Sequence, residues 1–188
     1  PAQTLYELLT KTKDKHGALN AVTFQMFSGP KDPAETLSWT ELHARVTQAA
    51  NMFRALGVGE NDTVAFVLPN TTETVVTLLG GMVAGVANPI NPLLEPEQIA
   101  AILRETNAKV VVTLRQFPKT DVAQKVAEAV RHAPNVNTVL EVDLNRYLDF
   151  PKSLIVPFIR PKAPVRHKAS VLNFTRELGR RPTSLEFD

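Results

Sequence analysis

The 188-residue sequence predicts an α/β protein with a largely parallel sheet flanked by helices. Two observations support this fold class. The stretch 62–91 has the pattern of a buried strand, an amphipathic helix and a second strand, and two further helix–strand pairs follow it, so that the order from 62 to 142 is βαβαβαβ. A strand, a crossover helix and a strand joined this tightly form a right-handed βαβ unit, whose strands are parallel.

The N-terminal part is expected to form a helix and a hairpin. Thr4 and Glu7 make a capping-box pattern that opens a helix over 4–12. Residues 21–27 alternate apolar and polar side chains with the period of a half-buried strand. Beyond the turn SGPKDP, residues 35–37 are its candidate partner strand.

A second capping box leads into the central strand. Ser38 and Glu41 open a helix that extends to Leu56 and carries one apolar face. Residues 62–68 are apolar and β-branched almost throughout, which is typical of a strand buried on both faces. Pro69 ends this strand because proline has no N–H to donate to a neighbouring strand.

The crossover helix that follows begins after the turn LPNTT. Asn70 or Thr71 is its candidate N-cap, and Gly85 is expected at its C-cap in a conformation with positive φ. The second strand then covers 86–90. The apolar stripe of the helix consists of Val75, Leu78, Leu79, Met82 and Val83.

The same alternation continues to residue 142. Pro96 suits the first position of a helix, and Lys109 begins a strand that ends at Leu114. Asp121 is the candidate cap of the next helix, and 136–142 supplies another strand. These elements complete the predicted α/β unit.

The pattern changes near residue 148, where four prolines follow within a short distance. We therefore divide the chain into an α/β subdomain over 1–147 and a Pro-rich, basic connector over 148–188, with a short helix expected over 169–178. Residues 151–188 hold 8 Lys and Arg against 3 Asp and Glu, whereas 1–150 hold 13 against 16.

Three interpretations of the basic segment are open. Contact with an anionic membrane surface through 151–181 would use the apolar residues within 154–159. Nucleic acid is not expected as a partner, because base-stacking aromatic residues and a reader motif are lacking. The favoured interpretation is a connector that packs against protein outside this chain.

Composition places the chain among ordinary folded proteins. It is 44% hydrophobic and 21% charged, and no apolar run approaches the roughly 20 residues of a membrane span. The N-terminus lacks the pattern of a secretory signal, and the absence of cysteine excludes disulfides and thiol nucleophiles and fits a reducing, cytoplasmic location. Pro1 in place of Met indicates processing or an excised piece.

Motifs that would cradle a nucleotide are missing from the sequence. The turn after the central strand has no glycine, and neither a Walker pattern nor GxGxxG occurs. Gly80 and Gly81 lie inside the crossover helix, where close packing on a neighbour explains them. Asn70 and Asn91 follow strand ends, where open α/β sheets bind ligands, but local capping and turn roles are favoured.

Ionisable residues give no catalytic pattern either. His43 is assigned to rim packing on its helix, with catalysis as the alternative. The four histidines, which show no metal-ligand spacing, are His16, His43, His132 and His167. The carboxylates assigned mainly to caps and first turns are Glu35, Glu41, Glu73, Glu95 and Glu97. We therefore predict no catalytic, cofactor-binding or metal-binding residue.

Four short motifs, in order over the stretch 36–114, carry a family resemblance. They are the Ser-Trp-x-Glu-Leu helix start at 38–42, the Gly-Val-x-x-x-Asp-x-Val step at 57–64, the Leu-Pro-Asn turn at 68–70, and AGVANPINP at 84–92. Together they resemble the N-terminal region of the large domain in the adenylate-forming superfamily, the acyl-CoA synthetases and other AMP-dependent ligases. The ending RxPTSLEF is similar to the approach to the phosphate-binding loop in the acyl-CoA ligase branch.

The resemblance implies a reaction that this stretch does not complete. Such enzymes use ATP and Mg²⁺ to activate a fatty acid or another carboxylate as an acyl-AMP, which coenzyme A usually attacks. Their phosphate loop, adenine and ribose motifs, metal-binding glutamate and catalytic lysine belong downstream of Asp188. The resemblance therefore implies an N-terminal fragment of an acid–thiol ligase of fatty acid metabolism that is not catalytic alone.

The partners expected from this interpretation are the remainder of the enzyme and a second copy of the chain, since missing neighbours would leave apolar faces exposed. ATP, Mg²⁺ and coenzyme A are expected for the parent enzyme and not for this stretch. The alternative hypothesis is a stand-alone, non-enzymatic α/β interaction module with a basic tail that binds membranes.

Overall fold

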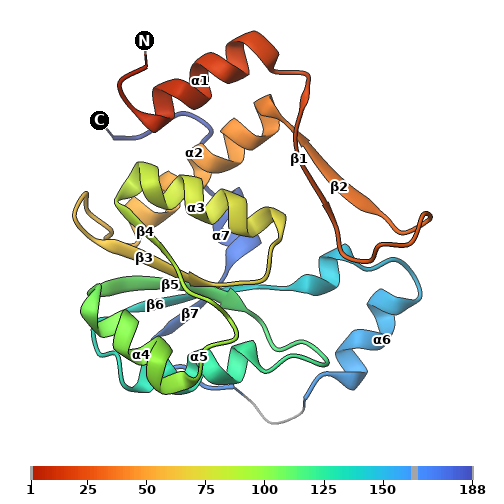
Figure 1. Ribbon diagram of the computed structural model, residues 1–188, viewed down its shortest axis with the longest axis vertical. Coiled ribbons are helices and arrows are strands. Elements are labelled where there is room, and N and C mark those ends of the chain that lie inside the picture. The colour runs from red at the N-terminus through yellow and green to blue at the C-terminus, as the bar shows by residue number, and fades with distance from the viewer. Residues whose placement is uncertain (1, 162–164, 188) are drawn as a thin grey trace.

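A computed structural model describes residues 2–161 and 165–187. Its centre is a five-stranded parallel sheet with the strand order β4-β3-β5-β6-β7, and helices cover both faces (Figure 1). The predicted fold class, a largely parallel sheet flanked by helices, is confirmed. None of the described helices has both the length and the apolar character needed to cross a bilayer.

The sheet and the helices that cover it follow in alternation along the chain. The strands are β3 (Thr63–Val67), β4 (Val86–Pro89), β5 (Ala108–Leu114), β6 (Thr138–Val142) and β7 (Ser170–Asn173). One face is covered by α2 (Trp39–Ala55), α3 (Thr72–Ala84) and α7 (Phe174–Gly179), and the other by α4 (Pro96–Glu105) and α5 (Val122–Arg131) (Figure 1).

The remaining elements surround this unit. The helix α1 (Leu5–His16) packs on α2 and α3, and the strands β1 (Asn20–Gln25) and β2 (Ala34–Ser38) form an antiparallel hairpin. A 3₁₀ turn, η1 (Leu144–Tyr147), and the helix α6 (Lys152–Ile159) follow β6.

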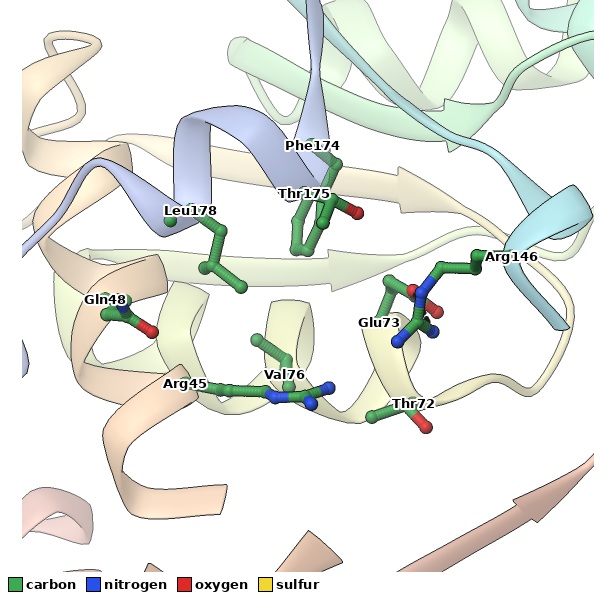
Figure 2. Close-up of a pocket in the computed structure, with 10 residues that line it drawn as sticks. Arg45, Gln48, Thr72, Glu73, Val76, Arg146, Phe174, Thr175 and Leu178 are labelled. Carbon is green, nitrogen blue, oxygen red and sulfur yellow. Dashed lines mark hydrogen bonds and ion pairs between the residues drawn. The ribbon is translucent and has the colours of Figure 1, made fainter. Parts of the chain in front are cut away.

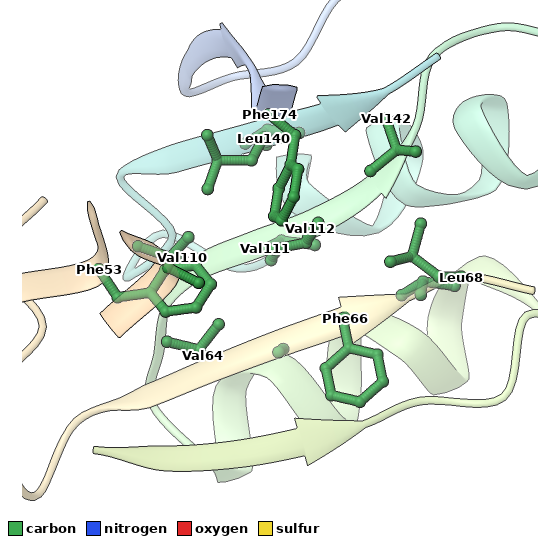
Figure 3. Packing of buried hydrophobic residues seen from close by; sticks show 14 of the residues in the cluster. Phe53, Val64, Phe66, Leu68, Val110, Val111, Val112, Leu140, Val142 and Phe174 are labelled. Atoms are coloured by element: carbon green, nitrogen blue, oxygen red, sulfur yellow. The ribbon is translucent and has the colours of Figure 1, made fainter. Parts of the chain in front are cut away.

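The central strands β3, β5 and β6 are mostly buried, as the composition of β3 and β5 predicts, whereas the edge strands β4 and β7 are partly exposed. All five residues of β3 are buried, and Val110, Val111 and Val112 of β5 have no exposed surface. Figure 3 shows Phe53 of α2 and Phe174 of α7 beside the strands, where they fill the space between sheet and helices. Burial of this apolar surface is the main source of the stability of the unit.

The predicted capping box opens α2, and a second one, at Thr71 and Thr74, opens α3. The Ser38 hydroxyl accepts a hydrogen bond from the Glu41 amide, and the Glu41 carboxylate accepts one from the Ser38 amide at 2.8 Å. Thr71, and not Asn70, caps α3, since its hydroxyl accepts from the Thr74 amide. Asp121 precedes α5 but its side chain makes no cap hydrogen bond, so that part of the prediction is wrong.

The glycines of α3 serve close packing. A Cβ on Gly80 would lie 2.6 Å from the Cβ of Ala49 in α2, and one on Gly81 would lie 3.2 Å from the Cβ of Ala87 in β4. Close packing was the interpretation given to both glycines, and it is confirmed.

Gly85 is required for a different reason from the one predicted. Its φ is −173°, which is extended backbone and not the positive-φ C-cap expected from sequence. A Cβ there would lie 2.6 Å from the carbonyl oxygens of both Asp62 and Gly59. The chain needs glycine because α3 turns into β4 directly against the backbone before β3.

The segment after residue 147 is more regular than the sequence suggested. Ser170–Asn173 is a strand, β7, that pairs in parallel with β6, so the helix expected over 169–178 is confirmed only from Phe174 onwards. The Asn173 side chain caps α7 by accepting a hydrogen bond from the Arg176 amide at 2.8 Å. A strand of four residues is too short to show a hydrophobic period in the sequence. Pairing with β6 is what stabilises β7. The division after residue 147 stays a prediction.

Candidate functional site

The direction of the chain reverses across the sheet between β3 and β5. The chain leaves β3 through α3 to reach β4 on one side, and returns through α4 to β5 on the other side of β3. In open α/β sheets, ligands bind outside the carboxyl ends of the strands at such a topological switch point. This carboxyl edge is therefore the candidate functional site.

An apolar groove of about 240 Å³ lies at this edge. Pro69 follows β3, Pro92 follows β4, and Leu114 ends β5, and these three residues line the groove together with Phe117 and Leu144. Its polar neighbours have local roles. Asn91 accepts a hydrogen bond from the Leu93 amide at 2.9 Å in a turn, as predicted, and Asn70 is exposed.

A cluster of charged side chains lies beside the first turn of α3, and we refer to it as the Glu73 cluster. It comprises Glu35 of β2, Arg45 of α2, Glu73 of α3, and Arg146 and Tyr147 of η1. Arg146 pairs with Glu73 at 2.8 Å and with Glu35, while the Tyr147 hydroxyl donates to Glu73 at 2.6 Å. Arg45 pairs with Glu35 at 3.1 Å. Two carboxylates and two guanidinium groups balance in charge.

The Glu73 cluster forms one end of a cleft of about 200 Å³ between α2, α3 and α7. Figure 2 shows Glu73 and Arg146 facing each other there, with Phe174 and Leu178 on the other side of the cleft. The assignment to caps and first turns is therefore wrong for Glu35, which lies in strand β2, and incomplete for Glu73. Glu73 does lie in the first turn of α3, but only 6% of its side chain is exposed, and an ion pair from η1 neutralises it.

Electrostatics hold Glu35 and Tyr147 of the Glu73 cluster each in one protonation state near neutral pH. Burial opposes ionisation of Glu35, but hydrogen bonds and charge from Arg146 outweigh it and lower the pKa of Glu35 to about 2. Burial and the charge of Glu73 raise the pKa of Tyr147. A group that neither gains nor loses a proton is a poor general acid or base. The Glu73 cluster therefore has a structural role, in which its ion pairs join β2, α2, α3 and η1.

The lowered pKa of Glu35 leads us to expect that the folded chain loses stability in acid. Its pKa is lowered from 4.5 to about 2 in the folded chain, so its contribution is complete above pH 4.5 and is lost as the pH falls toward 2. Since solvent partly screens the pair, we expect a loss of about 1–2 kcal/mol in the free energy of unfolding. Urea unfolding across this pH range measures it. The Glu35→Gln variant should show a flatter pH dependence, and an unchanged profile would contradict the assignment.

The histidines are dispersed in the structure. His43 is half-buried, with its Nε2 atom 2.9 Å from the Thr10 hydroxyl, and burial lowers its pKa, which agrees with rim packing. His132 pairs with Glu128 at the surface, and His167 is 3.5 Å from Glu141. Within 2–161 and 165–187, no three His, Asp or Glu side chains are grouped to hold a metal ion.

Asn51 of α2 has a role that sequence reasoning missed. The side chain is 1% exposed and donates to the carbonyls of Pro182 and Ser184, at 3.1 and 2.8 Å, while it accepts from the Glu186 amide at 3.0 Å. It thus fixes residues 182–186 along α2. Gln48, one turn earlier on α2, also donates to the Arg181 carbonyl at 2.9 Å, and nothing in the local sequence signals either role because the partners lie more than 130 positions away.

The carboxyl edge does not fit a nucleoside triphosphate or its Mg²⁺. Pro69 offers no N–H at the turn after β3, and the glycine-free turn leaves no close backbone approach. Arg45 and Arg146, the cations at the neighbouring cleft, are already neutralised by carboxylates. The groove at this edge is lined mainly by apolar side chains instead.

These features define an open, parallel α/β domain with a switch point at its carboxyl edge. The chain belongs to the AMP-binding enzyme family, whose family model matches residues 9–175. Members of this family use ATP. The resemblance inferred from the four motifs is thereby confirmed.

Individual relatives agree with the family. Marinolic acid–CoA ligase of Pseudoalteromonas sp. is 32% identical over 132 residues, which is 70% of this chain and 20% of that protein. Long-chain-fatty-acid–CoA ligase of Bacillus subtilis is 26% identical over 159 residues, 84% of this chain and 26% of the relative.

A solved structure shows the same fold. The anthranilate CoA ligase AuaEII, in complex with anthranoyl-AMP, matches 97% of this chain and 28% of its own, with a TM-score of 0.68 and 17% identity. The chain spans between a fifth and just over a quarter of the length of these proteins.

Proposed function

We propose that this chain is the N-terminal part of an ATP-dependent acyl-CoA ligase, which converts a carboxylate to an acyl-AMP and then to an acyl-CoA thioester. One observation carries the proposal: the matches include nearly all of this chain but only a small part of each relative. A chain matched over 97% of its length to 28% of a CoA ligase corresponds to one subdomain of such an enzyme.

The charge distribution supports the further proposal that the chain is not catalytic alone. Phosphoryl and adenylyl transfer depend on cations and N–H donors aimed at the charge that develops on phosphate oxygens. In the part of the chain that the structure describes, Arg45 and Arg146 already pair with carboxylates at the cleft. The groove at the carboxyl edge has apolar walls.

The role we propose for the chain in the enzyme is positional. Asn51 fixes residues 182–186 to α2, and this segment is the one whose RxPTSLEF motif resembles the approach to a phosphate-binding loop. The α/β unit would thus anchor the start of that loop, and the remainder of the enzyme would be the main partner of the chain. The proposal does not specify which acid the enzyme activates, since the relatives act on different carboxylates.

The test compares the 188-residue chain with the protein encoded by its complete reading frame. We expect the longer protein to release pyrophosphate from ATP in the presence of a carboxylic acid and the 188-residue chain to release none above background. Pyrophosphate release by the 188-residue chain would overturn the proposal that it is not catalytic alone. A reading frame that ends at Asp188 would favour the stand-alone module instead.

A further inference from the structure

The helix α6 exposes most of its apolar surface. Only Val156 of this helix is buried, whereas Leu154, Ile155, Phe158 and Ile159 are between 49% and 82% exposed. Positions 154, 155, 158 and 159 fall within one half of a helical surface. An apolar surface of this kind on a folded domain indicates an interaction site.

Two neighbouring phenylalanines extend this surface. Phe150, just before α6, is 78% exposed, and Phe27, at the end of the β1–β2 hairpin, is 42% exposed. We refer to the six residues as the α6 patch: Phe27, Phe150, Leu154, Ile155, Phe158 and Ile159. Figure 1 shows α6 at the periphery of the molecule, away from the central sheet.

A groove of about 460 Å³ runs beside the patch, between α6, the hairpin and the loop after β5. Its apolar walls include Met26, Phe117 and Ile155, and Lys119 and Lys152 line it as well. Ammonium groups beside an apolar surface are the pattern that residues at a membrane interface show.

The charges of the two lysines are available to a ligand. Among the described residues, no carboxylate forms an ion pair with Lys119 or Lys152, and Lys152 lies 5.0 Å from the centroid of the Phe27 ring. The nearby Arg160 differs, because Asp143 neutralises it through two contacts, one of 2.7 Å. Lys119 and Lys152 therefore carry unpaired positive charge beside the groove, opposed in part by the exposed Asp149 next to Phe150, and anionic phosphate groups attract such lysines.

The position of α6 is fixed before any partner binds. Arg160, at its C-terminal end, is paired with Asp143, and the Asn145 side chain donates to the Ser153 carbonyl at 3.1 Å. The helix is thus held to η1 with its apolar half outward. A rigid surface loses little conformational entropy on binding. Such a surface suits a planar partner better than a partner around which the segment would have to fold.

We propose that the α6 patch docks the protein on an anionic membrane surface, with Phe158 and Leu154 in the acyl region and Lys119 and Lys152 at the phosphates. The helix has 8 residues and lies on the bilayer without spanning it. Docking through α6 is independent of the proposed enzyme class, so either can fail without the other.

The experiment is co-sedimentation of the 188-residue chain with vesicles. One set contains phosphatidylcholine alone, and the other contains phosphatidylcholine with phosphatidylglycerol. We expect binding to the anionic set, weakened by added salt because salt screens the lysine charges. No binding to the anionic vesicles, or equal binding to both sets at all salt concentrations, would overturn the proposal.

Matched variants locate the surface. Leu154→Ser with Phe158→Ser should weaken partition into anionic vesicles by about tenfold or more, because two large apolar side chains are lost from the interface. Leu93→Ser, at a residue 81% exposed in another loop, is the control and should bind as the parent does. Lys152→Glu should weaken binding, while Lys15→Glu, an exposed lysine on α1, should not.

A second copy of the chain is the competing occupant of the patch. If the Leu154→Ser and Phe158→Ser changes abolished a dimer in light scattering and left vesicle binding intact, the patch would be a dimer interface and the proposal would be overturned. Loss of vesicle binding by a variant whose mass in solution is unchanged would support it.

Discussion

Replacing Arg146 with Met should destabilise the chain by about 2–4 kcal/mol. The substitution keeps much of the apolar stem but removes the guanidinium that pairs with Glu73 at 2.8 Å and with Glu35. Glu73 is almost fully buried, so its charge would remain without its cation in a medium of low dielectric constant. The loss is below that of a fully buried pair, because 29% of the Arg146 side chain is exposed.

Urea unfolding monitored by circular dichroism measures this loss, and Arg131→Met is the matched control. Arg131 pairs with Glu128 on α5, and both side chains are about half exposed, so its loss should cost less than about 0.5 kcal/mol. Adding Glu73→Gln to Arg146→Met should recover part of the stability, since the unpaired charge is then removed. Equal effects of the two arginine substitutions would show that the Glu73 cluster contributes nothing beyond a surface pair.

The second large effect is expected at Gly80. An alanine Cβ at this position would lie 2.6 Å from the Cβ of Ala49 and 3.2 Å from the carbonyl oxygen of Val46, so α2 and α3 would have to separate. Overpacking of this kind costs about 1–3 kcal/mol, although alanine by itself favours the helix over glycine.

Gly179 provides a control of opposite sign. It ends α7, and no atom lies within 4 Å of the Cβ that alanine would add there. Gly179→Ala should therefore leave stability unchanged or raise it by up to about 1 kcal/mol, through the lower entropy of the unfolded chain. Thermal unfolding of both variants tests the pair. A stabilising Gly80→Ala substitution would contradict the contact between α2 and α3.

Local patterns in the sequence determined the parallel α/β unit. The buried composition of β3, the capping box at Ser38, the helix cap at Asn70 or Thr71, and Pro96 at the start of α4 are properties of short stretches, and each formed as predicted, with Thr71 as the cap. Such signals act within one or two turns of chain, so they can be read without knowing what packs where. Four motifs in order also identified the family.

Contacts between distant residues could not be read in this way. The Glu73 cluster joins side chains up to 112 positions apart, and Asn51 holds a segment more than 130 positions away. The strand β7 exists because β6 offers a free edge, and Gly85 is needed because α3 turns into β4 against the backbone of Asp62. In each case the reason lies in a neighbour that only the tertiary fold supplies, so the sequence determined the elements, and the fold decided which polar and glycine residues hold them together.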